Sequence, residues 1–104
     1  MLEKDLYKQV KDYLSIQENL GRLLWWRSGS IQGKMESGAY IREGRKGLQD
    51  ITILLPNGKI LLIELKGTKT PIREDQLLWK QKCVLLGHTF IFIRDLEELK
   101  QIIH

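Results

Sequence analysis

Cysteine and long apolar runs are what this sequence most lacks. Cys83 is the one cysteine among the 104 residues, so an internal disulfide is excluded and a reducing compartment is favoured. No apolar run approaches the length that spans a membrane, and the charged N-terminus does not have the pattern of a signal peptide. These absences predict a soluble, cytoplasmic protein.

The composition predicts a single domain over residues 1–104. A hydrophobic fraction of 42% is ordinary for a folded chain, and the length is enough for one small core but not for two. The sequence has no internal repeat and no linker that would divide it. A net charge of +4 and an isoelectric point near 9.3 favour a polyanionic partner such as nucleic acid.

Hydrophobic periodicity and turn residues predict an α/β fold of order α-β-β-β-α-β-α. The second helix is expected to begin with Thr70 as its N-cap and Pro71 as its first residue. The strand that follows is apolar throughout, so we expect it at the centre of a mixed sheet with helices on both faces. The expected elements are a helix over 2–19, a strand over 23–27, strands on either side of 56–58, a helix from 70 to 87, a strand over 88–94 and a helix after 95.

The turn at Pro56-Asn57-Gly58 fixes the register of the central hairpin. A three-residue loop, with Pro56 in the second position of a type I turn and Gly58 left-handed, sets Leu55 opposite Lys59. Asp50 then falls opposite Glu64. A two-residue Asn-Gly loop would instead put the two carboxylates on opposite faces of the sheet. We favour the three-residue loop because it uses the fixed backbone angle of the proline.

In this register Asp50, Glu64 and Lys66 share one face of the sheet, since residues two apart on a strand point the same way. Two carboxylates about 5 Å apart repel by roughly 3 kcal/mol at an effective dielectric constant of about 20. A proton or a cation between them would relieve this repulsion, and Mg²⁺ is held by one or two carboxylates with waters and phosphates. The pattern predicts metal-assisted phosphodiester hydrolysis, with Lys66 orienting a water or neutralising charge.

Residues 28–47 form a predicted loop that is rich in glycine and in cations, with a short strand possible around 39–41. Long loops in compact domains are usually functional or mobile, and glycines let the backbone approach phosphates. The alternative is a solvated loop whose charges do little. The cations that we expect to contact nucleic acid are Arg27, Lys34, Arg42, Arg45, Lys46, Lys69 and Arg73.

Two further polar residues have ordinary explanations on spacing alone. Glu3 lies in the first turn of the first helix, where the positive end of the helix dipole favours a carboxylate. Gln76, near the start of the second helix, is expected to be solvated. Trp25 and Trp26 are adjacent on a strand and must face opposite sides, so one ring is expected in the core and the other against a second layer or a partner.

Four pieces of the sequence together resemble the VRR-NUC (virus-type replication-repair nuclease) domain of the PD-(D/E)xK nuclease superfamily. They are Glu3, the tetrapeptide Gly47-Leu-Gln-Asp50, the tripeptide Glu64-Leu-Lys66 and Gln76. The resemblance covers nearly the whole chain and implies a stand-alone domain with a restriction-endonuclease-like core, of prokaryotic or viral origin. One residue departs from the pattern, because Gln49 stands where the superfamily often has proline.

The resemblance also implies roles for these residues. Lys66 would position or activate the attacking water, and Gln76 would support the site or contact the nucleic acid. Stand-alone members resemble Holliday-junction resolvases and can act as homodimers. The implied ligands of a catalytic Mg²⁺ or Mn²⁺ are Asp50, Glu64, the Leu65 backbone carbonyl and Glu3.

The residues and the resemblance together predict a metal-dependent DNA endonuclease that is specific for branched DNA or Holliday junctions. Two other interpretations stay open. A non-catalytic nucleic-acid-binding module with a degenerate site would explain the basic loop and the tryptophans but not the Asp50–Glu64 pair. A structural ion cluster, in which Lys66 neutralises both acids, would make the pair important for folding only.

Overall fold

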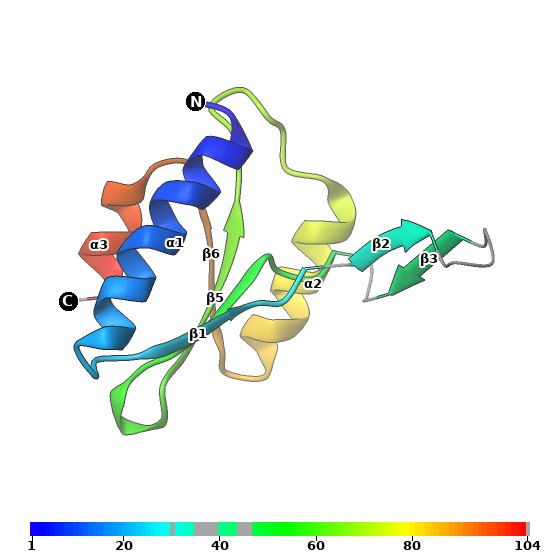
Figure 1. Cartoon of the computed structure of the whole chain (residues 1–104). Coiled ribbons are helices and arrows are strands. Elements are labelled where there is room, and N and C mark those ends of the chain that lie inside the picture. Colours follow the sequence, from blue (N-terminus) through cyan, green and yellow to red (C-terminus); the bar gives the residue numbers. More distant parts are fainter. Residues whose placement is uncertain (30, 35–39, 44–46, 104) are drawn as a thin grey trace.

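Four strands form one mixed sheet in the order β1-β4-β5-β6 (Figure 1). β1 is antiparallel to β4, β4 is antiparallel to β5, and β5 is parallel to β6. The computed structural model describes residues 1–29, 31–34, 40–43 and 47–103. The elements are α1 (Glu3–Asn19), β1 (Leu24–Arg27), β2 (Ile31–Lys34), β3 (Tyr40–Glu43), β4 (Ile51–Leu54), the 3-10 turn η1 (Pro56–Gly58), β5 (Ile60–Leu65), α2 (Glu74–Leu85), β6 (Thr89–Ile93) and α3 (Leu96–Ile103).

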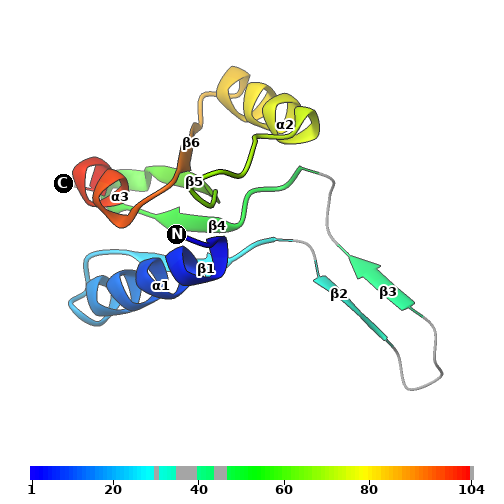
Figure 2. The same cartoon turned by 90° about the horizontal axis from the view of Figure 1, so that it is seen from above.

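Helices cover both faces of this sheet, as predicted. α1 and α3 lie on one face and α2 lies on the other (Figure 2). Alternate residues of β4 and β5 enter the core between the sheet and the α1–α3 layer, because successive side chains on a strand point to opposite faces. The smaller core under α2 is built from Leu62, Cys83 and Phe90, with Trp79 and Phe92 against it. The sheet is therefore apolar on both faces, and its polar site residues lie at one end of it.

The hairpin has the register that the three-residue loop predicts. Ile51 pairs with Ile63, Leu54 pairs with Ile60, and the Leu55 N–H donates to the Lys59 carbonyl at 2.8 Å. The turn type differs from the prediction, because Asn57 is itself left-handed (φ 65°) and Gly58 follows it with φ 74°. Asparagine tolerates this conformation better than most residues. The pairing is unaffected, so the predicted faces of the two strands are correct.

The start of α2 was predicted wrongly. The helix begins at Glu74 and not near Thr70, and Arg73 is its N-cap residue. The Gln76 side-chain oxygen accepts a hydrogen bond from the Arg73 backbone N–H at 3.1 Å, which is one half of a capping box. This bond fixes the helix start three residues after the one that Thr70 and Pro71 suggested.

β6 lies at the edge of the sheet, so its predicted central position is wrong. It pairs with β5, and no strand of the described residues pairs with its other side. The apolar sequence reflects cover on both faces, with Phe90 under α2 and Ile93 in the core on the α1–α3 side. Cover on two faces does not require a neighbour on both edges.

The predicted loop over 28–47 contains a second, two-stranded sheet. β2 and β3 pair antiparallel, with Gln32 opposite Arg42, and the pair projects away from the main sheet (Figures 1 and 2). The short strand expected around 39–41 therefore exists, but it is longer and has a partner. The order of elements gains two strands over the predicted one.

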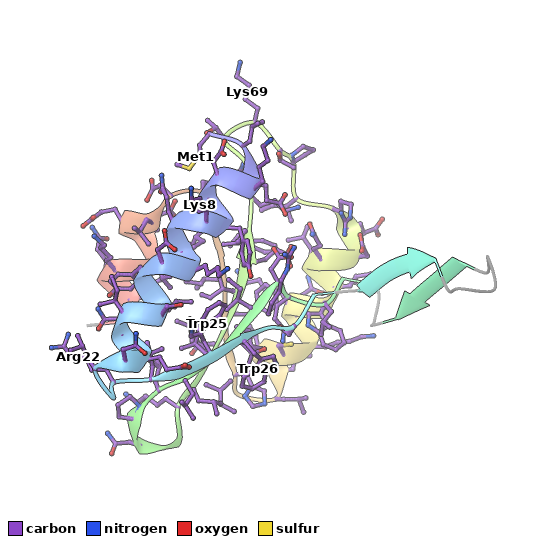
Figure 3. All side chains as sticks on the ribbon, viewed as in Figure 1. Met1, Lys8, Arg22, Trp25, Trp26 and Lys69 are labelled. Carbon is purple, nitrogen blue, oxygen red and sulfur yellow. The ribbon has the colours of Figure 1, made fainter. Side chains whose placement is uncertain are left out.

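The adjacent tryptophans of β1 face opposite sides, as predicted. Trp25 is half-buried and packs against the core under α1, whereas Trp26 on the other face is 48% exposed (Figure 3).

Among the described residues, no helix has both the length and the apolar character needed to cross a membrane.

Candidate active site

Asp50 and Glu64 meet at one end of the hairpin. Asp50 directly precedes β4, Glu64 lies near the end of β5, and the hairpin register continues to bring them opposite one another. The Asp50 Oδ2 accepts a hydrogen bond from the Leu65 backbone N–H at 2.8 Å. The side chain of Asp50 thus takes the place of the next ladder bond between the two strands and ties one acid to the strand that carries the other.

The Glu64 carboxyl is buried and only half satisfied. The residue is 3% exposed, and its Oε1 accepts a hydrogen bond from Gln76 Nε2 at 3.1 Å. Its Oε2 is buried and has no hydrogen-bond partner among the described residues. A buried acceptor without a partner is costly, so an unpaired carboxylate oxygen at this position calls for a proton or a ligand.

Burial is the main cause that raises the pKa of Glu64 from 4.5 to about 9. The facing Asp50 raises it further, by its charge and by a hydrogen bond that forms only when one of the two acids is protonated. The nearby Lys66 ammonium acts in the opposite direction. In the absence of a bound cation, the pair therefore holds a proton on Glu64 at neutral pH.

Lys66 follows directly after β5 and is 2% exposed. Its backbone N–H donates to the Ile93 carbonyl at 2.9 Å, which continues the parallel pairing with β6. Its ammonium group is close enough to lower the pKa of both Glu64 and Glu3. The three residues predicted from the hairpin register are therefore brought together at one place, and two of them are buried.

Glu3 reaches the same place from the first turn of α1. Although the residue is exposed overall, partial burial of its carboxyl, followed by the charge of Asp50, raises the pKa of Glu3. Glu3 and Asp50 line a pocket of about 200 Å³ together with Lys4, Tyr7, Arg27 and Leu65. Within the described residues, no group of three or more histidine, cysteine, aspartate or glutamate side chains is arranged to hold a metal ion. The predicted role of Glu3 as a ligand stays a prediction.

The oxygen atoms at this site fit a hard divalent cation. The Oε2 of Glu64 has no hydrogen-bond partner among the described residues, and the Glu64 carboxyl lies close to Asp50. The N–H and C=O of a strand residue point to the same neighbour, so the Leu65 carbonyl is directed to the side on which its N–H meets Asp50. Two carboxylates and a carbonyl are the donors that Mg²⁺ and Mn²⁺ prefer. The residues present therefore suit the implied metal.

Gln76 is not the solvated residue that its spacing suggested. It is 3% exposed, and its amide links the Arg73 backbone to the Glu64 carboxyl. The same group therefore starts the helix and orients the acid. Glu64 could not be identified as its partner before the docking of α2 was known.

Gln49, which directly precedes Asp50, belongs to a buried hydrogen-bond network. Its Oε1 accepts from Trp79 Nε1 at 2.7 Å, and its Nε2 donates to Thr52 Oγ1 at 3.0 Å. Thr52 donates to Ser28 Oγ at 2.9 Å, and Ser28 donates back to the Gln49 carbonyl at 3.1 Å. The network joins β1, β4 and α2 at the residue next to Asp50, so α2 supports both acids of the site.

Gly47 must be glycine for two reasons. Its φ is 81°, a conformation that side chains disfavour, and a Cβ placed on it would clash with the Asp75 carbonyl oxygen. The close contact lets the segment before Asp50 pass directly against the first turn of α2. This explains the glycine three residues before the aspartate.

Contacts from Arg94 and from the start of the chain hold the turn after Lys66 in place. The Arg94 guanidinium donates to the carbonyls of Gly67 at 2.6 Å and Thr70 at 2.9 Å. The Thr68 N–H donates to the Met1 carbonyl at 3.0 Å, which ties the start of α1 to the end of β5. Sequence patterns gave no sign of this contribution from Arg94.

The predicted nucleic-acid contacts have different surroundings. Arg27 lies at the site, whereas Arg73 is 63% exposed and pairs with Asp75 at 3.1 Å. Lys69 projects from the turn after Lys66 (Figure 3). Lys34 and Arg42 are on β2 and β3, and Arg45 and Lys46 lie outside the described residues.

The chain is an α/β domain with a mixed sheet, whose central hairpin brings an aspartate, a glutamate and a lysine together at one end. A solved structure described as "VRR_NUC domain" is similar to this chain, with a TM-score of 0.67 and 22% sequence identity over 97% of this chain and 92% of that one. The chain thus has a VRR-NUC-like fold. The sequence matches no family model and no curated protein.

Proposed function

We propose that this protein is a metal-dependent DNA endonuclease that hydrolyses phosphodiester bonds at the Asp50–Glu64–Lys66 site. The observation that carries the proposal is the buried Oε2 of Glu64, which has no hydrogen-bond partner among the described residues although the carboxyl lies close to Asp50. A domain that used this pair only for stability would be expected to satisfy that oxygen. A cation-binding site accounts for both the unpaired oxygen and the nearby acid.

Asp50, Glu64 and the Leu65 carbonyl would hold Mg²⁺ or Mn²⁺. The bound ion would supply a Lewis acid for the phosphate and lower the pKa of an attacking water. Lys66 would orient that water and stabilise the negative charge that develops on the phosphate oxygens. Gln76 donates to Oε1 of Glu64 and leaves Oε2 for the ion, so its role is to orient the ligand.

The substrate that we propose is branched DNA, including four-way junctions, cut by a homodimer that places one site on each of two strands. The projecting β2–β3 pair would extend the contact along the DNA backbone, with Lys34 and Arg42 as phosphate ligands (Figures 1 and 2). Arg45 and Lys46, which lie outside the described residues, are proposed as further phosphate ligands. Replacing these four cations is expected to reduce the salt dependence of DNA binding. An unchanged dependence would show that these four cations do not contact phosphates.

Cleavage of four-way junction, flap, single-stranded and linear duplex DNA in Mg²⁺, Mn²⁺ or EDTA tests the proposal. Asp50→Asn, Glu64→Gln and Lys66→Ala are expected to abolish cutting while DNA binding survives. Glu74→Gln, which removes the charge of an exposed acid outside the site, is the matched control and should cut normally.

Symmetric nicks in the junction alone, together with a dimer in sedimentation, would support a resolvase. Metal-dependent cutting of flaps or single strands would keep the nuclease and change its substrate. Binding without cutting in any metal would favour the non-catalytic nucleic-acid-binding module. Loss of folding in Asp50→Asn and Lys66→Ala, with no cutting by the unmodified protein, would favour the structural ion cluster.

A further inference from the structure

The pocket beside the two acids has a wall that the proposed chemistry does not yet use. This wall is formed by Lys4 and Tyr7 from the first two turns of α1 and by Arg27 at the end of β1. Lys4 and Tyr7 are three residues apart on the helix, so they lie on the same side of it. Glu3 of the same helix, Asp50 and Leu65 at the end of β5 also line the pocket. The pocket therefore combines two carboxylates with two cations.

The Arg27 guanidinium is held against the ring of Tyr7. Its Cζ lies 4.4 Å from the ring centroid, within the range of a cation–π contact. A guanidinium stacked in this way keeps its N–H donors in the plane of the fork, where they can bind two oxygens of one anion. No ion pair within 4.0 Å joins Arg27 to a carboxylate of the described residues, although its charge lowers the pKa of Glu3. Its donors are therefore not used by the neighbouring acids.

We propose that this pocket binds the phosphodiester group of the strand to be cut, with Arg27 and Lys4 as its phosphate ligands. Tyr7 is a positioning residue, which acts by holding the guanidinium in place. The proposal rests on the proposed function, because a cation held by Asp50 and Glu64 would offset the negative charge of the carboxylates at the pocket. A phosphodiester carries its negative oxygens in a plane that the Arg27 fork can match, and it is small enough for a pocket of about 200 Å³.

Salt dependence of DNA binding provides the first readout. A labelled duplex is titrated in Mg²⁺ at several salt concentrations, with Lys66→Ala as the common background so that DNA is bound and not cut. Arg27→Ala and Lys4→Ala are each expected to reduce the slope of log K against log salt by about 0.9, the value for one lost phosphate contact. Lys8→Ala is the matched control, because Lys8 is exposed one turn further along α1 and does not line the pocket (Figure 3).

Tyr7 is tested by its ring. Tyr7→Leu is expected to weaken binding by about 2- to 5-fold, which corresponds to an exposed cation–π contact. Tyr7→Phe keeps the ring and should restore the affinity of the parent protein. Arg27→Lys keeps the charge but loses the planar fork, so it should retain the salt slope and still bind more weakly. Equal affinities for the Leu and Phe variants would show that the ring does not position Arg27.

A thymidine dinucleotide, which has a single phosphodiester, provides the second readout. In an NMR titration with Mg²⁺, the Arg27 side-chain N–H and the Tyr7 ring are expected to shift, and Arg27→Ala should remove the Tyr7 shift. No shift at either residue, with salt slopes of Arg27→Ala and Lys4→Ala equal to that of Lys8→Ala, would overturn the proposal. Circular dichroism of each variant identifies any that do not fold, and Arg27→Lys then carries the test.

The two proposals can fail separately. If the dinucleotide shifts Arg27 and Tyr7 but the protein cuts no DNA in any metal, the phosphate pocket stands and the proposed catalysis fails. If the protein cuts DNA and both Arg27→Ala and Lys4→Ala cut it with unchanged KM, the proposed nuclease function is supported and the proposal that the pocket binds the phosphodiester is wrong.

Discussion

Replacing Glu64 with glutamine should stabilise the metal-free protein while it abolishes cleavage. Glutamine has the shape of a protonated glutamate. Its oxygen can still accept from Gln76, and its NH₂ group can donate to Asp50, which faces the carboxyl in the native protein. The variant therefore satisfies the buried position without a proton or a cation. Sites that trade stability for activity behave in this way.

The size of the effect follows from the pKa of Glu64. In the folded protein this pKa is raised to about 9, whereas the unfolded chain has a value of 4.5. Between these values the folded protein holds a proton that the unfolded chain has released, so the free energy of unfolding falls as pH rises. From pH 4.5 to pH 7 the fall is about 1.4 kcal/mol per pH unit, or about 3 kcal/mol. This is a large share of the roughly 5–15 kcal/mol that stabilises a domain.

Urea unfolding in EDTA at pH 5, 7 and 9, followed by tryptophan fluorescence, measures the difference. Unfolding free energy should fall with pH more steeply in the native protein than in Glu64→Gln, because all other titrating groups are shared. Glu74→Gln should keep the native slope. Mg²⁺ at about 100 times its Kd should add about 2.7 kcal/mol to the native protein and nothing to Glu64→Gln. Parallel pH profiles for the native protein and Glu64→Gln would refute the assignment of the buried proton.

Three further substitutions, each measured by urea unfolding, test the contacts that hold the segments around the site in place. Gly47→Ala should cost about 2–4 kcal/mol, because it adds a left-handed alanine and a clash with the Asp75 carbonyl; a smaller cost would mean that the segment can move away from α2. Trp79→Phe should cost about 1–3 kcal/mol, since it leaves the buried Gln49 oxygen without its donor, and a native-like stability would indicate that water replaces the indole. Arg94→Met should cost a similar amount, about 1–3 kcal/mol, by freeing carbonyls of the turn after β5, with unchanged stability as the contrary result.

The residues of the turn were enough to predict that Asp50 and Glu64 lie opposite one another in the hairpin. Pro56 and Gly58 fix the loop length, and the loop length fixes every pair in the hairpin. The strict two-residue alternation of strands then puts Asp50 and Glu64 together. These relations depend on residues close in sequence, so no knowledge of the rest of the fold was needed.

The supporting residues could not be predicted because they depend on how distant elements dock. Gln76 appears solvated on a helical wheel until α2 is placed over Glu64. Gln49 and Trp79 are thirty residues apart, and no spacing rule connects them. The start of α2 differs from the predicted start for the same reason, since Gln76 both caps the helix and donates to Glu64. Buried polar pairs of this kind are a tertiary property.

The edge position of β6 matters for how the chain behaves when it is only partly folded. Thr89–Ile93 is uncharged, free of proline and composed of strong β-formers, which are the features of segments that stack into cross-β fibrils. In the native domain β5 occupies one side of this strand, and Arg94 and Asp95 follow it as flanking charges of the kind that limit aggregation. Heating that separates β6 from β5 would therefore expose both edges of an aggregation-prone strand, and irreversible precipitation should follow.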